Sequence, residues 1–184
     1  MDADTVIVDL NTESLSRMAL TGPWCLHCPL CERDERHLFT TECITSLAEI
    51  EPIVRDSRSG VKLAIRHSEI IGYAIFGRPE LFPGIKRAGL PVDQDALFLA
   101  ALSTTDWARE HNVHADLLIE VMTFAADHGY TQVVAAFRPD DPKSAEPAAE
   151  LLEAAEFTLG KPGSSGLGLA TITLKDWQDQ TEIE

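Results

Sequence analysis

The sequence has few basic residues for its length. Its 184 residues include 15 lysines and arginines but 30 aspartates and glutamates, which gives a formal net charge of −15. Proteins that bind nucleic acids or anionic membranes contact phosphate groups through basic patches, so this balance disfavours both kinds of partner. The charge is compatible with a cationic or amine-bearing partner, and equally with an acidic surface that serves only solvation.

Long apolar runs and a leader sequence are also missing. Polar residues or turns interrupt every apolar run before it reaches the roughly 20 residues that cross a bilayer. The segment Met1–Thr5 lacks the basic region and the apolar core of a signal peptide. The sequence therefore predicts a cytoplasmic protein with no membrane partner.

Cysteine is scarce, but three of the four cysteines are evenly spaced. Cys25, Cys28 and Cys31 follow a C-x2-C-x2-C pattern, and Cys43 lies further along the chain. Thiolates at this spacing can converge on one zinc ion, with Cys43 or a histidine completing a tetrahedral set. In a cytosolic chain, metal binding or redox chemistry is favoured over a structural disulfide. The alternative, reduced thiols packed in a loop, stays open.

The length and the 45% of hydrophobic residues suit one domain with a full core over residues 1–184. Within this domain we expect a cysteine-rich loop over 21–43 and an acidic tail over 175–184. Prolines and glycines over 79–94 predict an insert that lies outside the core.

The chain is organised around the stretch Asp95–Phe137. It contains a continuously apolar strand over Ala96–Leu102, a polar loop over Thr104–His114, an amphipathic helix that ends before Gly129, and an apolar strand over Gln132–Phe137. A strand–helix–strand unit of this kind predicts a right-handed crossover between parallel strands. Backbone N–H groups at a helix start can hold an anion, so the functional question is whether the loop binds phosphate.

The other predicted elements follow from apolar periodicity and turn signals. The predicted strands are Thr5–Leu10, Val61–Arg66, Ile70–Phe76 and a terminal hairpin of Phe157–Leu159 with Leu167–Leu174. The predicted helices are Glu13–Leu20, a helix from Thr41 or Glu42 to about Arg55, and Ser144–Glu156.

This order of elements resembles the GNAT superfamily of N-acetyltransferases over nearly the whole chain. The segment Leu102–Leu118 lies over the family's acetyl-CoA motif, in which a strand is followed by R/Q-x-x-G-x-G/A and a helix. Gly72-Tyr73-Ala74 and Phe157 support the resemblance, and a subgroup also shares the Cys25/Cys28 pair. The resemblance implies an α/β (α+β) fold with a mixed sheet of six or seven strands and helices on both faces.

The resemblance also implies acetyl-CoA as cofactor and an amine, on a small molecule or a protein, as acetyl acceptor. In the family, loop glycines let the backbone approach the pyrophosphate, and the splayed fourth strand admits the pantetheine arm and polarises the thioester carbonyl. A homodimer is one oligomeric state that this fold allows. The implied cofactor-binding residues are Leu102, Ser103, Thr104, Arg109, Glu110, His111, Asn112, Val113, His114 and Ala115.

The sequence departs from the family motif at several of these positions. Arg109 matches, but Asn112 and His114 stand where the motif has glycines. Asparagine tolerates a left-handed backbone better than most residues, whereas the imidazole of His114 adds bulk. Glu110 and Asp116 add negative charge at the helix start, where each could itself satisfy the helix dipole.

Catalytic residues are less clearly indicated. Leu152 stands where the family often has a tyrosine acid, and Ala96 where some members have a glutamate base. Asp95 is the candidate base, although it points to the opposite face of a regular strand and could instead cap it. Three hypotheses therefore stand: a GNAT-type N-acetyltransferase, a catalytically degenerate GNAT-fold binding or regulatory protein, and a zinc or thiol module based on the cysteine-rich loop.

Overall fold

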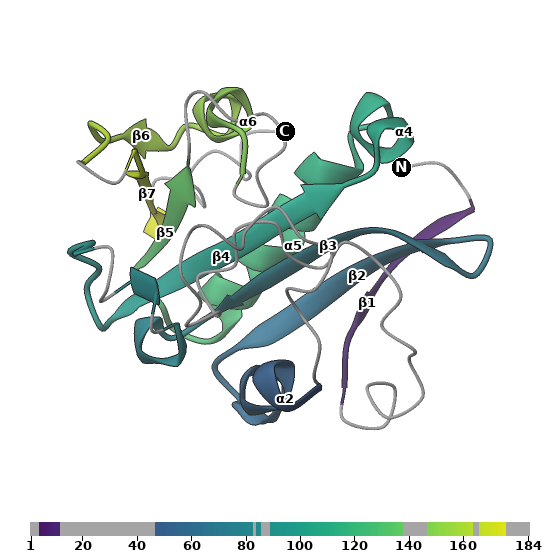
Figure 1. The fold of residues 1–184 in the computed structure, drawn as a ribbon, viewed down its shortest axis with the longest axis horizontal. Coiled ribbons are helices and arrows are strands. Elements are labelled where there is room, and N and C mark those ends of the chain that lie inside the picture. Colours follow the sequence, from purple (N-terminus) through teal and green to yellow (C-terminus); the bar gives the residue numbers. More distant parts are fainter. Residues whose placement is uncertain are drawn as a thin grey trace.

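The computed structural model contains a mixed sheet of seven strands, in the order β1-β2-β3-β4-β5-β7-β6 (Figure 1). It describes residues 4–11, 47–82, 84–85, 89–137, 147–163 and 166–175. The strands are β1 (Thr5–Asp9), β2 (Gly60–Arg66), β3 (Glu69–Gly77), β4 (Ala96–Thr104), β5 (Gln132–Phe137), β6 (Thr158–Leu159) and β7 (Gly168–Thr173). The helices are α2 (Leu47–Arg55), the 3-10 helix η2 (Pro79–Leu81), α4 (Asp106–Glu110), α5 (Val113–Asp127) and α6 (Ala149–Ala154).

Among the strands that the structure describes, only β4 and β5 run parallel, and every other neighbouring pair is antiparallel. Helices α4 and α5 lie between these two parallel strands in the chain, so the predicted strand–helix–strand connection is present. The hairpin between β2 and β3 turns at His67 and Ser68, which both have positive φ angles, of 49° and 66°. Turns with two such residues match the twist of the flanking strands. The predicted α/β fold with a mixed sheet of six or seven strands is confirmed.

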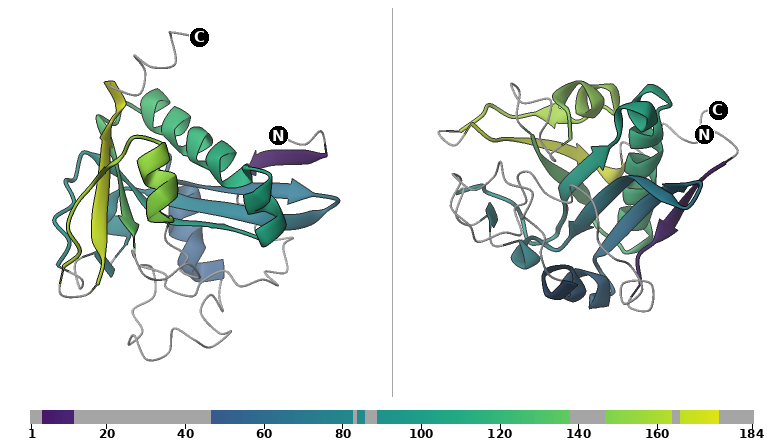
Figure 2. Two further views of the ribbon diagram at one scale, coloured as in Figure 1. Left: turned by 90° about the horizontal axis from the view of Figure 1, so that it is seen from above. Right: turned by 45° about the vertical axis from the view of Figure 1, so that its right-hand side comes forward.

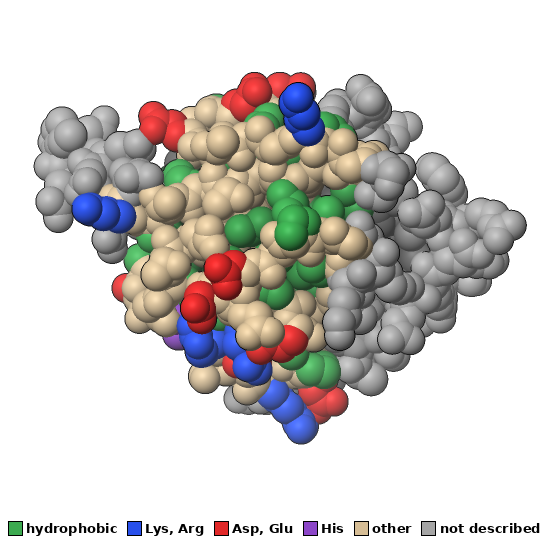
Figure 3. All heavy atoms as spheres, turned by 90° about the vertical axis from the view of Figure 1, so that its left-hand side faces the viewer, with side chains coloured by type: hydrophobic (Ala, Val, Ile, Leu, Met, Phe, Trp, Pro, Cys, Tyr) green, Lys and Arg blue, Asp and Glu red, His purple; other side chains and the backbone are tan. Residues whose placement is uncertain are grey.

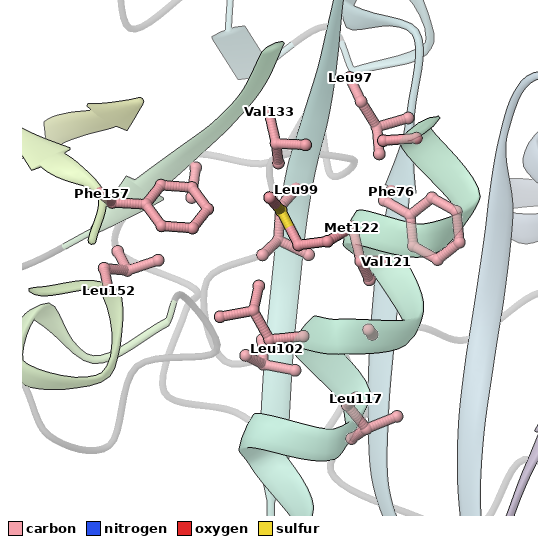
Figure 4. Packing of buried hydrophobic residues seen from close by; sticks show 14 of the residues in the cluster. Phe76, Leu97, Leu99, Leu102, Leu117, Val121, Met122, Val133, Leu152 and Phe157 are labelled. Carbon is pink, nitrogen blue, oxygen red and sulfur yellow. The ribbon is translucent and has the colours of Figure 1, made fainter. Parts of the chain in front are cut away.

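Helices cover both faces of the sheet (Figure 2). The helices α5 and α6 lie on one face, and α2 lies on the other. The apolar run of β4 is buried throughout because its side chains alternate between these two layers: Leu97 and Leu99 pack toward α5, whereas Ala96 and Phe98 pack toward α2. Figure 4 shows the α5 layer, where side chains of α5 lie over those of β4.

The parallel pairing of β4 with β5 is short. It runs from Ala96 opposite Gln132 to Leu99 opposite Ala135 and then stops. The register between β3 and β4 skips Ala100, which is a β-bulge at the same level. Beyond this point the strands part, and β5 continues in contact with β7 alone. The bulge and the parting open a gap in the middle of the sheet.

Two predictions about irregular segments are wrong. The insert over 79–94 does contribute to the core, because η2 turns the chain so that Phe82 and Ile85 are buried, with 1% and 7% of their surface exposed. The polar loop after β4 contains the short helix α4, because the Thr105 hydroxyl accepts a hydrogen bond from the Ala108 N–H (3.3 Å) and caps its start.

Some predicted elements are only partly described. The helix predicted over 42–55 is described from Leu47 onward, and the one predicted over 144–156 is helical over Ala149–Ala154. The helix predicted over Glu13–Leu20, the cysteine-rich loop and nearly all of the acidic tail lie outside the described residues. Among the described helices, none combines the length and apolar character that a bilayer crossing requires.

A polar network closes one end of the sheet. Arg78 donates from Nε to Asp56 (2.7 Å) and from Nη1 to Glu80 (2.8 Å), and the Tyr130 hydroxyl donates to the Arg58 carbonyl (2.6 Å). Burial opposes ionisation of Asp56, but the Arg58 N–H and Arg78 outweigh it and lower the pKa of this carboxyl. In Figure 3, acidic and basic side chains likewise lie next to one another on the visible face. This end of the molecule is held by paired charges.

Candidate functional site

Where the pairing of β4 with β5 stops, backbone groups of β4 are left without a partner on β5. The Thr105 N–H donates to the Ile71 carbonyl of β3 (2.9 Å). In an antiparallel ladder, successive N–H groups turn to opposite sides of the strand. The N–H groups of Thr104 and Leu102 therefore turn away from β3 and toward the gap. They provide donors where a polar group entering the gap would lie.

A short turn, the α4–α5 junction, joins α4 to α5 at the end of this gap. Asn112 has φ 59° and ψ 18°, the left-handed conformation, and its N–H donates to the Arg109 carbonyl (3.1 Å). Most residues are strained in this conformation, but asparagine tolerates it. Asn112 thus adopts the left-handed conformation that a glycine would adopt at this position of the motif.

The first N–H groups of α5 are available to a ligand. The N–H groups of Ala115 and Asp116 donate back to the Asn112 carbonyl (2.9 and 3.2 Å). Those of Val113 and His114 make no hydrogen bond with any described residue, and the Asn112 side chain does not cap the helix. Unpaired N–H groups and the positive end of the helix dipole make this helix start a candidate anion site.

Gly72 on β3 lets this junction lie close to the sheet. A Cβ atom at Gly72 would lie 2.8 Å from the Thr104 methyl group, 3.2 Å from a Leu117 methyl group and 3.2 Å from the Ser103 carbonyl oxygen. A side chain there would push away the end of β4 or α5. Gly72 therefore allows the end of β4 and the start of α5 to lie close to β3.

Charged and polar side chains surround the start of α5 unevenly. Arg109 is exposed, and its Nη1 atom lies 4.0 Å from Oδ1 of the exposed Asp106, which is a weak surface ion pair that an anion could replace. Burial lowers the pKa of His114, the charge of Arg109 adds to this effect, and Asp116 partly opposes it. The imidazole is therefore neutral at pH 7. The Nδ1 atom of His114 and the Oδ2 atom of Asp116 are both buried without a hydrogen-bond partner.

A cleft of about 290 Å³ lies beside this site, between α5 and α6. It is mostly apolar and lies on the same face of the sheet as the α5 helix. Its lining residues are Ala115, Leu118, Ile119, Met122, Leu151, Ala154, Ala155, Glu156 and Phe157. Since Ala115 belongs to the first turn of α5, the cleft and the anion site adjoin, and together they fit a ligand with a charged part and an extended, less polar arm.

The structure brings most of the predicted cofactor residues together. Leu102, Ser103 and Thr104 border the gap, and the segment Arg109–Ala115 forms the junction and the first turn of α5. The His111 ring instead stacks on the Trp107 ring (centroids 4.0 Å apart), and its Nδ1 lies 2.8 Å from the Trp107 carbonyl oxygen. The side chain of His111 thus packs against α4 and does not enter the site.

Asp95, the predicted base, lies apart from this site. It is exposed in the turn before β4, and its N–H donates to the Asp93 carboxylate (3.3 Å). It precedes Leu102 by seven positions, which corresponds to about 20 Å along an extended strand. Asp95 is therefore out of direct reach of a group bound at Leu102.

The predicted metal ligands Cys25, Cys28, Cys31 and Cys43 lie outside the described residues. Within the described ranges, no group of three or more histidine, cysteine, aspartate or glutamate side chains is arranged to hold a metal ion. The zinc hypothesis gains no support from the structure.

Sequence reasoning missed the residues that α6 contributes to the cleft. Leu151, Ala154 and Ala155 line it, whereas Leu152 is fully buried against the sheet. Apolar residues at three- and four-residue spacing on a second helical face were the available signal. Sequence reasoning also missed the packing of Trp107. Its ring stacks on His111, and its centroid lies 4.0 Å from the Arg66 guanidinium carbon.

Comparison with known proteins identifies the fold. The chain matches no model of a known protein family and no curated protein sequence. Among solved structures, it is similar to an N-acetyltransferase from Staphylococcus aureus Mu50, with 14% identity and a TM-score of 0.64, over 94% of this chain and 99% of that one. It is similar to yncA from Salmonella typhimurium, solved with its cofactor acetyl-CoA, with 17% identity and a TM-score of 0.62, over 93% and 94% of the two chains.

A third similar structure is an acetyltransferase of the GNAT family from Streptococcus pneumoniae, with 13% identity and a TM-score of 0.60, over 92% of this chain and 98% of that one. At these identities the likeness establishes the fold alone. The chain has the GNAT fold, as the resemblance implied.

Proposed function

We propose that this protein is an N-acetyltransferase of the GNAT superfamily, which binds acetyl-CoA along β4, α5 and α6 and transfers the acetyl group to an amine. The observation that carries the proposal is the parting of β4 and β5 after Leu99 and Ala135, next to the unpaired N–H groups of Val113 and His114. A cytoplasmic location, expected from the sequence, belongs to the same proposal.

The residues present fit the cofactor. The N–H groups of Val113 and His114, with the Arg109 guanidinium, would hold the pyrophosphate. The cleft between α5 and α6 would take less polar parts of the cofactor. Bound acetyl-CoA supplies an acetyl thioester, and the Leu102 N–H is oriented to polarise a carbonyl group in the gap.

The chemistry requires an uncharged amine. With acetyl-CoA bound, attack by the amine on the thioester carbonyl would form an amide bond and break the carbon–sulfur bond. The amine would give up one proton to a base or to solvent, and the coenzyme A thiolate would take up a proton and leave as the thiol. Asp95 is too far from Leu102 to take this proton directly, so it would act only through a relay. The net charge of −15 favours the approach of a cationic amine over that of an anionic acceptor.

Isothermal titration with acetyl-CoA tests the cofactor site. We expect binding to the wild-type protein, and binding weakened about fivefold to tenfold in Arg109→Gln, which loses a charged donor. We expect binding about threefold to tenfold tighter in Asp116→Asn, because a carboxylate beside the pyrophosphate is removed. Asp127→Asn, at the far end of α5, is the matched control and should leave the affinity unchanged.

The possible outcomes separate the hypotheses. An absence of acetyl-CoA binding would overturn the proposal and favour a GNAT-fold binding protein without catalysis, an alternative to which the acids Glu110 and Asp116 at the helix start point. Binding that is insensitive to Arg109 and Asp116 would place the cofactor elsewhere. Where binding is found, release of the coenzyme A thiol with a panel of primary amines tests transfer itself.

A further inference from the structure

The side chains at the end of β4 alternate between the two faces of the sheet. Leu102 is 5% exposed and belongs to the α5 layer, where Figure 4 shows it. Thr104 turns to the same layer, because its methyl group and a Leu117 methyl group lie 2.8 and 3.2 Å from the position of a Cβ atom at Gly72. Successive strand residues point to opposite faces. Ser103, between them, therefore faces the other side of the sheet, on which α2 lies (Figure 2).

Tyr73 on β3 faces this same side. It is directly opposite Ser103 in the register of β3 with β4, it is 7% exposed, and it belongs to the apolar layer on the α2 side. Side chains of directly opposite residues lie on one face, with their Cβ atoms about 4.5 to 5.5 Å apart. Tyr73 and Ser103 are therefore neighbours, and the buried Tyr73 ring limits the positions that the Ser103 side chain can adopt.

The Ser103 side chain lies next to the backbone group that would polarise the thioester. Ser103 directly follows Leu102, whose N–H turns toward the gap, and one strand residue spans about 3.4 Å. Ser103 is half-buried, and within the described part of the chain its hydroxyl has no hydrogen-bond partner. A serine hydroxyl can both donate and accept hydrogen bonds. It is therefore available to a polar group that reaches the gap from the α2 side.

The two faces of the sheet separate the two reactants. The cleft for the cofactor lies between α5 and α6, on one face. A thioester that enters the gap from this face leaves the opposite face to the acceptor. There the strands beside the gap carry Ala101 of β4 and Ala136 of β5, which are both 2% exposed. Apolar surroundings disfavour the charged form of an amine, and only the uncharged form can attack.

We propose that Ser103 binds the acceptor: its hydroxyl accepts a hydrogen bond from an N–H of the amine and turns the amine lone pair toward the thioester carbonyl. Tyr73 is a positioning residue that holds the Ser103 side chain in place. Ser103 forms no covalent bond with the acetyl group. This inference rests on the proposed N-acetyltransferase function, and it assigns to the acceptor a residue that the family resemblance implied for the cofactor.

Steady-state kinetics with n-butylamine as acceptor, followed by release of the coenzyme A thiol, tests the role of Ser103. We expect the KM for butylamine to rise about fivefold to tenfold in Ser103→Ala, because one hydrogen bond to the amine is lost. The affinity for acetyl-CoA, measured by isothermal titration, should not change. Ser103→Thr and Ser103→Val have nearly the same shape and differ in the hydroxyl, so only the valine variant should show the higher KM. Ser57→Ala, in the exposed turn before β2, is the matched control and should leave both quantities unchanged.

A double-mutant cycle tests the positioning role of Tyr73. Tyr73→Leu should raise the KM for butylamine at least about threefold, whereas in the Ser103→Ala background it should raise this KM no further, because Tyr73 acts through Ser103. Additive effects of the two substitutions would overturn the positioning role. Thermal unfolding of each variant confirms that it is folded.

The outcomes separate this inference from the function on which it rests. A wild-type protein that does not bind acetyl-CoA would overturn the proposed function. Acetyl-CoA binding without transfer to butylamine would overturn the inference alone, because the proposed contact involves only the amino group. An unchanged KM for butylamine in Ser103→Ala and Ser103→Val would also overturn it, and so would a loss of acetyl-CoA affinity in its place.

Discussion

The two ends of α5 are built in opposite ways. At the C-terminal end, Gly129 has a φ of 71°, its N–H donates to the Ala126 carbonyl (3.2 Å), and the Tyr130 N–H donates to the Ala125 carbonyl (3.0 Å). These two bonds form a Schellman motif. The His128 ring also stacks on Phe124, with centroids 3.8 Å apart.

At the N-terminal end a similar turn is left incomplete. Asn112 has the same left-handed conformation, and its N–H donates to the Arg109 carbonyl. The second bond of the motif would run from the Val113 N–H to Ala108, but the Val113 N–H makes no hydrogen bond with the described part of the chain. His114 and Asp116 each leave a buried polar atom unpaired at this end.

The difference indicates that the C-terminal end of α5 contributes to folding stability, whereas the N-terminal end has groups available to a ligand. Unpaired buried polar groups cost free energy, and a ligand bound at this end of the helix would reduce that cost. The closed end should therefore respond to substitution through folding stability, and the open end through affinity for acetyl-CoA.

The largest effect is expected at Asn112. In Asn112→Val, a β-branched residue is forced into the left-handed conformation, so the free energy of unfolding should fall by about 2 kcal/mol. The junction should shift, and acetyl-CoA affinity should fall at least about tenfold. In Asn112→Gly both quantities should stay near the wild-type values, because glycine adopts this conformation without strain.

Denaturant unfolding and isothermal titration measure the two quantities. Unchanged affinity in Asn112→Val would show that the left-handed junction does not shape the cofactor site.

A smaller effect, on stability alone, is expected at Gly129. A Cβ atom there meets nothing within 4 Å, so the cost of Gly129→Ala is only that of the left-handed backbone, about 1 to 2 kcal/mol of unfolding free energy. The affinity for acetyl-CoA should not change. Gly163→Ala is the control, because an added Cβ atom at Gly163 also has room. Its nearest neighbour, the Leu167 carbonyl oxygen, lies 3.8 Å away, which is ordinary van der Waals contact.

If Gly129→Ala weakened acetyl-CoA binding as much as Asn112→Val, the two ends would not be functionally distinct.

The smallest effect is a pH dependence at His114. Burial, and then Arg109, hold the pKa of His114 below its ordinary value of 6.5. The neutral form is therefore favoured in the folded protein, and the stability that it contributes is lost as the pH falls below 6.5 through the folded pKa. A bound pyrophosphate raises this pKa, so acetyl-CoA should bind about twofold to fivefold tighter at about pH 5.5 than at about pH 7.5.

Titration of the His114→Asn variant at the same pH values is the control, because protonation of the cofactor's own phosphates affects both proteins equally. Identical pH profiles would show that the imidazole does not face the pyrophosphate.

Several features of the fold were predictable because they depend on local sequence. The apolar run of β4 and the alternation of β2 predicted strands whose bounds agree to within two residues. The tolerance of asparagine for a left-handed backbone also suggested how Asn112 could stand at a glycine position. The insert over 79–94 was misjudged, because its prolines and glycines indicate turns but do not show that Phe82 packs against Phe98, with ring centroids 5.4 Å apart.

By itself, the sequence determined the elements and their order, since helix and strand periodicities and turn residues act over short distances. Only the tertiary structure decided the site. The gap between β4 and β5 exists because pairing stops at Leu99 and Ala135, two residues far apart in the chain. Whether the Val113 N–H is free depends on how α4 meets α5 above Gly72. Such features follow from packing between distant segments, which no local pattern records.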